Sequence, residues 1–322
     1  MTPILFFLVL EKMTFAAGYI PNIQFAPFYI AMEKGFYREE GIDLEIDYTM
    51  GPDILKLVAL GKIHVGSSDP DAFLNAVEHR LPLVHVATLY QSYPITLISK
   101  EKIEGPENLR GKRIGISGTY GSSYLGFKAL LGQLGLELKD IDLRAIGYTQ
   151  VATLKTGRVD AVIGYTNHEP VLLQHSGMKV HTLNLNRQSQ WPGVGLMTGR
   201  DFAKEKPDLL QGFLRATFRG VDYVLQQPEE SFKIVTQSYL PQINNDQRRA
   251  TEKEVLMRTL PFLKSAYSDD HGLGQCDPKR WENLVNIMIQ ENLLPAAVDW
   301  RQGVDRTFSL QQEKTIPMNR VE

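Results

Sequence analysis

The first fifty residues alternate between apolar stretches and short polar breaks. Residues 12–19 are apolar and rich in strand-forming side chains, and Pro21 and Asn22 interrupt them, since proline lacks the N–H of a strand ladder and asparagine suits turns. Residues 26–34 can form a helix that ends at a glycine. Residues 44–48 alternate apolar and polar side chains, the period of a strand. This segment therefore predicts a strand, a polar loop, a helix and a second strand.

The same succession continues along the chain until helical periodicity takes over. Further strands are expected at residues 62–66, 84–89, 95–99, 112–116, 142–146, 161–165, 179–183 and 194–198. Helices are expected at residues 51–61, 72–79, 124–134 and 151–156, after Pro170, and then at 207–226, 228–238, 251–262 and 278–291. Strands that alternate with helices favour an α/β fold, here with a helical C-terminal part.

Two stretches of the chain, residues 57–66 and 151–164, echo each other. Each reads as a helix, a glycine, a basic residue, a short strand and a second glycine. This echo predicts two α/β lobes that are built alike, rather than a short-period repeat.

Composition narrows the class of protein. The chain has 322 residues, of which 43% are hydrophobic and 22% charged, as expected for a globular protein with one large or two medium domains. The net charge is −2 and no basic stripe stands out in the sequence, which argues against a dedicated nucleic-acid binder. Cys276 is the only cysteine, which excludes an internal disulfide and a cysteine-based zinc site. The apolar residues 3–10 fit either the remnant of a signal sequence or a lead-in to the first strand.

Catalytic signatures are missing from the sequence. It contains no nucleophile elbow, no Walker phosphate loop and no two-histidine metal helix, and its seven histidines are scattered. We therefore expect no enzymatic activity and no metal site.

Aromatic and amide side chains gather instead in the loops predicted at strand ends, where open α/β sheets bind their ligands. Rings supply stacking surface and amides or carboxylates supply orientation, a combination that suits a flat heteroaromatic ligand. The Gly-rich turn at residues 117–123 precedes a predicted helix. Such a turn either presents N–H groups to a polar ligand or serves tight packing alone.

The opening motif, residues 19–42, strongly resembles that of the substrate-binding proteins of ABC importers. The particular branch includes binding proteins for thiamine pyrimidine precursors, sulfonates and riboflavin. The resemblance continues through residues 147–152, 157–161 and 164–170 and covers roughly residues 12–225. The segment Phe25–Tyr29 and the stretch around residues 167–169 look most like the riboflavin-binding members. The few basic residues in the predicted loops make a sulfonate a poorer fit.

This resemblance implies a type II periplasmic binding protein fold, with two lobes that close on a ligand. Lobe one would hold residues 12–95 plus 196–305, lobe two residues 96–195, and residues 306–322 would form a polar tail. The crossovers would fall near residues 95–99 and 193–198.

The resemblance also implies a function, a location and partners. The chain would capture riboflavin and deliver it to ABC permease subunits as an extracytoplasmic monomer, without nucleic acid and with no cofactor other than the transported ligand. Members are often lipid-anchored at a cysteine, and the sequence has none near its start. The alternatives are a binding protein for a thiamine pyrimidine precursor, a pyrimidine-synthesis enzyme on the same fold, and a sensor domain.

The expected ligand contacts combine rings, polar groups and the Gly-rich turn. They are Asn22, Phe25, Asp69, Tyr90, Ser117, Tyr120, Gly121, Tyr165, Asn167, Glu169 and Trp191.

Overall fold

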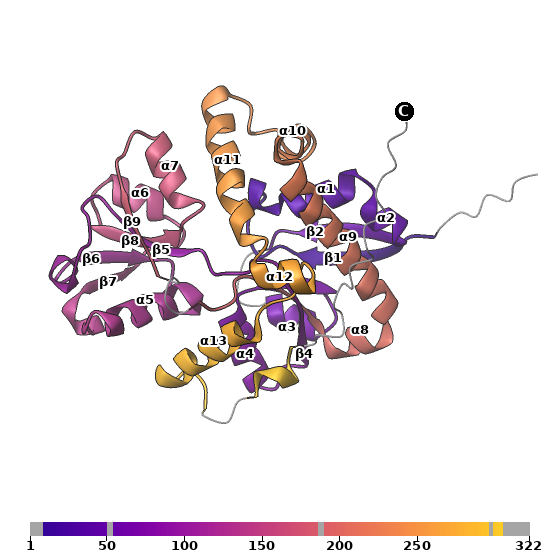
Figure 1. Cartoon of the computed structure of the whole chain (residues 1–322), viewed down its shortest axis with the longest axis horizontal. Helices are drawn as coiled ribbons and strands as arrows, with labels where there is room; N and C mark the ends of the chain where they lie inside the picture. Colours follow the sequence, from indigo (N-terminus) through magenta and orange to yellow (C-terminus); the bar gives the residue numbers. More distant parts are fainter. Residues whose placement is uncertain (1–8, 50–53, 186–189, 296–298, 305–322) are drawn as a thin grey trace, which may run out of the picture.

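The computed structural model describes residues 9–49, 54–185, 190–295 and 299–304. These residues form two α/β lobes, each built on one five-stranded sheet (Figure 1). Within the described ranges, no helix is both long enough and apolar enough to cross a membrane.

The sheet of lobe one has the strand order β2-β1-β3-β10-β4. Strands β1, β2 and β3 are parallel, whereas β10 runs antiparallel to both of its neighbours. The bounds are β1 Glu11–Ala16, β2 Ile42–Asp47, β3 Val65–Ser68, β4 Leu83–Thr88 and β10 Gly195–Gly199.

The sheet of lobe two repeats this plan with the order β7-β6-β8-β5-β9. Its strands β6, β7 and β8 are parallel, and β5 is antiparallel to β8 and β9. The bounds are β5 Ile95–Ser99, β6 Arg113–Ile116, β7 Asp142–Ala145, β8 Ala161–Tyr165 and β9 His181–Asn184. In each sheet the fourth strand is the one that enters from the other lobe, so the two lobes are topological copies.

Helices cover both faces of the sheet in lobe one. In β1, Phe15 faces the cluster that contains Phe28 of α1 and Phe213 of α9, while Ala16 faces the opposite cluster with α3 and α4. Gly220 of α9 is required for this packing, since a Cβ there would lie 2.1 Å from the carbonyl oxygen of Pro27 in α1. The bounds in lobe one are α1 Ala26–Glu33, α2 Phe36–Glu39, α3 Ile54–Ala59, α4 Pro70–Glu78, α8 Arg200–Glu205, α9 Pro207–Gln226, α10 Pro228–Ser238, α11 Asp246–Thr259, α12 Ala266–His271 and α13 Pro278–Gln290.

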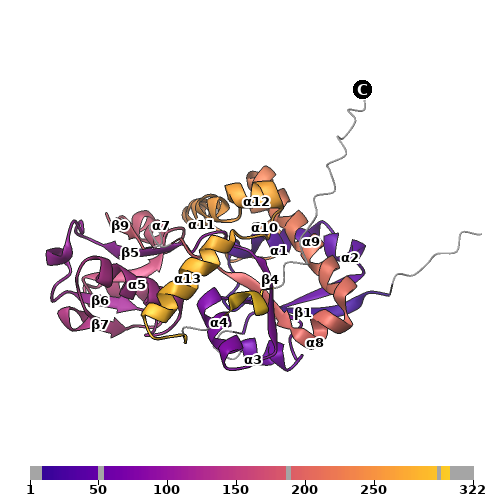
Figure 2. The same cartoon turned by 60° about the horizontal axis from the view of Figure 1, so that its bottom comes forward.

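Lobe two carries three α-helices among its described residues. They are α5 Gly121–Gln133, α6 Gln150–Lys155 and α7 Glu169–His175. The C-terminal helices of lobe one also touch this lobe. Helix α11 stands against α7, where His175 Nε2 lies 2.6 Å from Glu254 Oε2, and α13 approaches α5 through an ion pair between Lys128 and Glu291 (Figures 1 and 2).

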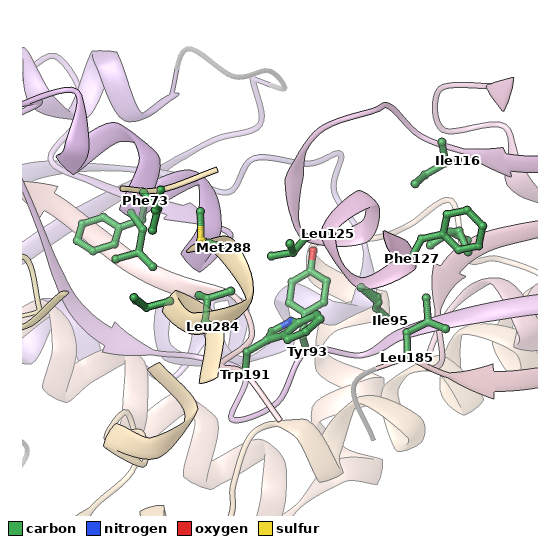
Figure 3. Close-up of a cluster of buried hydrophobic side chains, with 14 of the residues drawn as sticks. Phe73, Tyr93, Ile95, Ile116, Leu125, Phe127, Leu185, Trp191, Leu284 and Met288 are labelled. Carbon is green, nitrogen blue, oxygen red and sulfur yellow. The ribbon is translucent and has the colours of Figure 1, made fainter. Parts of the chain in front are cut away.

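A single apolar cluster extends through both lobes and the connection between them. Phe73 of α4 and Leu284 of α13 belong to it together with Leu125 of α5. Tyr93 and Trp191, from the two connections between the sheets, lie beside Leu125, with Phe73 and Leu284 on one side of them and Ile95 and Phe127 on the other (Figure 3). The structure therefore holds the two lobes packed together.

The predicted elements largely match this architecture. Strand β5 and helices α9 and α10 have the predicted bounds. The echo is confirmed, because α3 and β3 occupy the same places in lobe one as α6 and β8 in lobe two, and Gly61 and Gly157 between them share φ values of 68° and 69°. The α/β prediction is therefore correct, and it extends to the two-lobed plan.

Several boundaries differ from prediction. The strand expected at residues 62–66 lies at Val65–Ser68, because Ser67 and Ser68 pair with β10. The two connections between the lobes were expected near residues 95–99 and 193–198. The structure has strands β5 and β10 there, and the connections precede them, at residues 89–94 and between β9 and β10. Helices α2, α8 and α12 were not predicted, since they are short and carry little apolar periodicity. The apolar residues 3–8 and the tail after residue 304 lie outside the described residues.

Candidate functional site

The loops that follow the parallel strands of the two lobes meet at one place. Tyr19 follows β1 and Asp69 follows β3 in lobe one, while Tyr148 follows β7, and Tyr165 and Glu169 lie at the end of β8 and just after it. We call this group of five residues the seam. It lies at the carboxyl ends of strands, where α/β sheets place their ligand sites.

Two tyrosines make an aromatic contact across the seam. The rings of Tyr19 and Tyr148 are 5.6 Å apart, edge to face. Tyr148 is 63% exposed, so its ring is accessible from solvent. Burial, and after it the charge of Glu169, raises the pKa of Tyr19, while burial and the neighbouring Tyr120 and Asp69 raise that of Tyr148. Both rings are therefore neutral near pH 7 and available for stacking.

Tyr93 connects both sides of the seam from within the first connection between the lobes. Its hydroxyl donates to Asp69 Oδ2 over 2.8 Å and lies 2.7 Å from the hydroxyl of Tyr165. Since Tyr93 is fully buried, its hydroxyl depends on these protein partners. One hinge residue thus links a loop of lobe one to a strand end of lobe two.

The two carboxyl groups at the start of α4 are electrostatically linked. Asp69 precedes α4 and Asp71 lies in its first turn. Burial, together with the charge of Asp71, raises the pKa of Asp69 from 3.8 to about 7, and burial also raises the pKa of Asp71. Two carboxylates in a poorly solvated site cannot both ionise easily, and this favours retention of a proton by the pair.

Asp71 also reaches lobe two. The hydroxyl of Ser122, in the first turn of α5, donates to Asp71 Oδ1. Gly121, which begins α5 with a φ of 76°, would bring a Cβ to 4.0 Å from Asp69 Oδ2. The N-terminus of α5 therefore faces carboxyl groups that the protein itself supplies.

A further charged group lies where α7 begins. Glu169 Oε2 accepts the backbone N–H of Tyr165 over 2.7 Å, and its other oxygen lies 3.5 Å from His168 Nδ1. Although burial lowers the pKa of His168, Glu169 and Glu252 of α11 outweigh it and leave that pKa above its ordinary value. Glu252 belongs to lobe one and Glu169 to lobe two, so His168 interacts with a carboxylate from each lobe.

The predicted contacts of the opening stretch have structural partners. Asn22 accepts the backbone N–H of Gln24 and donates to the carbonyl of Ile20, both over 2.8 Å, so its amide holds the turn before α1. Phe25 is half-buried and its ring lies 6.4 Å from that of Tyr48. Direct ligand contact by Asn22 and Phe25 stays a prediction.

Three other predicted contacts are buried. Trp191 lies in the apolar cluster between the lobes, and Tyr90 packs near Phe262 with a ring distance of 6.2 Å. Asn167 is fully buried and its Nδ2 donates to Thr259 Oγ1 of α11 over 2.8 Å. In this closed arrangement these side chains join the lobes rather than forming an open surface.

The Gly-rich turn contributes its end to the neighbourhood of the seam. Tyr120 is 69% exposed and influences the pKa of Tyr148. Ser117 directly follows β6 and is partly buried, and Gly121 starts α5 beside Asp69. Of the predicted residues, Asp69, Tyr165 and Glu169 belong to the seam, with Tyr120 and Gly121 next to it.

Sequence reasoning did not select four residues of this arrangement, namely Tyr19, Tyr93, Tyr148 and Asp71. Tyr93 and Tyr148 stood in aromatic loops, which is a signal that could have selected them. Tyr19 stands at the end of a predicted strand, and Asp71 directly precedes the predicted helix 72–79, where a capping aspartate is common. Their importance arises from contacts between the lobes, which a linear pattern does not reveal.

A separate recess lies in lobe one, away from the seam. Burial lowers the pKa of His85 in its wall to about 3 and raises that of Cys276 to about 12. Both groups are therefore uncharged at neutral pH, as expected for interior packing. Among the described residues, no group of three or more side chains could hold a metal ion.

Comparison with known proteins places this geometry in context. The riboflavin-binding protein RibY of Chloroflexus aurantiacus is 32% identical over 304 residues, which cover 93% of this chain and 86% of the relative. The 4-amino-5-hydroxymethyl-2-methylpyrimidine phosphate synthase of Legionella pneumophila is 27% identical over 263 residues, 79% of this chain and 80% of the relative. The chain is thus similar both to a binding protein and to a protein named as an enzyme.

A solved structure confirms the fold. The periplasmic aliphatic sulphonate binding protein SsuA from Escherichia coli superposes with a TM-score of 0.69 at 16% identity, covering 94% of this chain and 95% of that structure. The expected two-lobed periplasmic binding protein fold is therefore correct. The family model described as NMT1/THI5 like matches residues 22–231, more than half of the sequence. This chain belongs to the NMT1/THI5-like family.

Proposed function

We propose that this chain is the solute-binding component of an ABC importer and that it captures riboflavin between its lobes. The observation that carries the proposal is the 32% identity with RibY along 93% of the chain, combined with an aromatic and polar seam at the carboxyl ends of the strands. A flat ligand ring can stack on tyrosine side chains such as Tyr19 and Tyr148. In this proposal the lobes open to admit the ligand, and the two rings contact it when the lobes close again.

The chemistry of the seam fits a carrier better than a catalyst. Its tyrosines have raised pKa values, and its two carboxyl groups are held by the hydroxyl of Tyr93 and the N–H of Tyr165. Such groups bind and orient a heteroaromatic ligand through hydrogen bonds. In this proposal the ligand passes unchanged to permease subunits, and the protein works outside the cytoplasm as a monomer.

Titration calorimetry tests the proposal with three compounds: riboflavin, 4-amino-5-hydroxymethyl-2-methylpyrimidine and an alkanesulfonate. We expect saturable binding of riboflavin with a stoichiometry of about one and a Kd at or below about 1 μM, as suits capture of a dilute vitamin. Mass spectrometry of the recovered ligand checks that it is unchanged. Binding of the pyrimidine without riboflavin binding would move the assignment to a thiamine precursor, and multiple turnover would replace a carrier by an enzyme.

A further inference from the structure

The charges around the seam are predominantly negative. Asp69 and Asp71 approach it from lobe one, and Glu169 approaches from lobe two. Their influence is visible in the tyrosines, because, after burial, Asp69 raises the pKa of Tyr165 and of Tyr93, and Glu169 raises that of Tyr19. The titratable base beside Glu169 is His168, which Glu169 and Glu252 flank on two sides. An entering anion would meet a negative potential here.

The start of helix α5, which could attract an anion, is already in use. The first turn of a helix favours a negative group, through its free N–H groups and its dipole. At the start of the 13-residue helix α5, Ser122 donates to the carboxyl of Asp71, and Gly121 lies beside Asp69. Lobe one therefore supplies the negative partner of this helix when the lobes are together, and a ligand phosphate would have to displace it.

A buried acceptor points to a ligand that donates hydrogen bonds. Asn167 is fully buried and its Nδ2 is bonded to Thr259, while its Oδ1 has no hydrogen-bond partner within the described residues. Tyr90 interacts with both Asn167 and Tyr165, so this amide belongs to the same polar network. An unpaired buried carbonyl is costly and favours an N–H or O–H donor.

We propose that the seam selects an uncharged, hydrogen-bond-donating heteroaromatic compound and rejects its phosphorylated form, with Asp69 and Glu169 as the specificity-determining residues. The proposal rests on the function proposed above and narrows its ligand class. Riboflavin has a ring N–H and a hydroxylated side chain, whereas riboflavin 5′-phosphate adds a terminal group with a charge near −2. The same contrast separates the free hydroxymethylpyrimidine from its phosphate.

The experiment compares these two pairs of compounds by calorimetry at about pH 8, above the raised pKa of Asp69, so that this carboxyl group is ionised. We expect riboflavin to bind at least about 30-fold more tightly than riboflavin 5′-phosphate. Raising the ionic strength from about 0.05 M to about 0.5 M screens the repulsion and should tighten binding of the phosphate alone by about fivefold.

Two isosteric substitutions test the residues. Asp69→Asn keeps the acceptor for Tyr93, and Glu169→Gln keeps the acceptor for the N–H of Tyr165. The double variant should reduce the preference for riboflavin over its phosphate to about fivefold, because the phosphate no longer meets the two carboxylates. Asp43→Asn, on an exposed position of β2, is the matched control and should leave the preference unchanged.

The outcomes separate the two proposals. Similar affinity for riboflavin and its phosphate would overturn the selection but leave riboflavin capture intact. A preference that neither salt nor the double variant alters would also overturn it, because size rather than charge would then exclude the phosphate. If riboflavin fails to bind while the free pyrimidine binds and its phosphate does not, the ligand assignment fails and charge selection stands. If neither uncharged compound binds, both proposals fail.

Discussion

The buried carboxyl group of Asp69 makes the stability of this protein depend on pH in a way that one substitution should remove. Tyr93 holds this group between the lobes, and Asp71 lies close enough to oppose its ionisation. Its pKa of about 7 in the folded protein compares with an ordinary value of 3.8. A carboxyl whose pKa is raised by folding stabilises the protein while it is protonated.

The sign and size of the effect follow from linkage. The contribution of Asp69 is fully present below about pH 4 and is lost as the pH rises through about 7. At about 1.4 kcal/mol for each pKa unit, the ceiling is about 4 kcal/mol. Asp69 keeps part of its surface exposed, and solvent screening reduces that ceiling, so we expect about 2 kcal/mol.

Asp69→Asn removes the titration and preserves an acceptor for Tyr93. At about pH 3.5, where the carboxyl is protonated in the folded chain and largely so in the unfolded chain, the variant and the wild type should have the same free energy of unfolding within about 0.5 kcal/mol. At about pH 8 the variant should be more stable by about 2 kcal/mol, because the wild type then carries a buried charge.

Urea unfolding measures this difference, with the fluorescence of the buried Trp191, Trp281 and Trp300 compared against circular dichroism to check for a single transition. Asp43→Asn serves as the control for removal of an exposed carboxylate. A stability difference that is equal at both pH values, or a variant that is less stable at about pH 8, would refute the reasoning.

Three further substitutions test the packing and the seam. Tyr93→Phe removes both hydrogen bonds of the hinge hydroxyl and should lower the free energy of unfolding by about 2 kcal/mol, measured in urea; an unchanged stability would show that the hydroxyl does not hold the lobes together. Gly220→Ala should cost about 3 kcal/mol or more in thermal unfolding, because its Cβ would strike the carbonyl of Pro27 in α1; an unaltered Tm would contradict the close helix contact. Tyr148→Ala should weaken riboflavin binding about tenfold in calorimetry and leave Tm nearly constant, since the side chain is largely exposed; undiminished affinity would remove Tyr148 from the site.

The sequence was most informative where a local rule and the tertiary structure agree. Helix α9 has its predicted bounds because its apolar stripe, which includes Phe213 and Val221, faces the core along its whole length. Strand β3 was misplaced because pairing with β10 extends it into Ser67 and Ser68. Those serines have no strand signal of their own, and a partner that lies far along the chain determines their conformation.

The candidate site shows the same contrast between what a local sequence pattern predicts and what distant contacts determine. The Gly-rich turn and the loop at Asp69 could each be recognised as a place where polar groups gather, and the turn was expected either to present N–H groups to a polar ligand or to serve tight packing alone. In the folded chain Asp71 meets the first turn of α5 through Ser122. Neither residue carries a sign of the other, because the contact exists only when the lobes are together. The helix start that could have presented its N–H groups to a ligand therefore meets a carboxyl group that the protein itself supplies. This contact arises from the packing of the two lobes, so the composition of either loop alone does not reveal it.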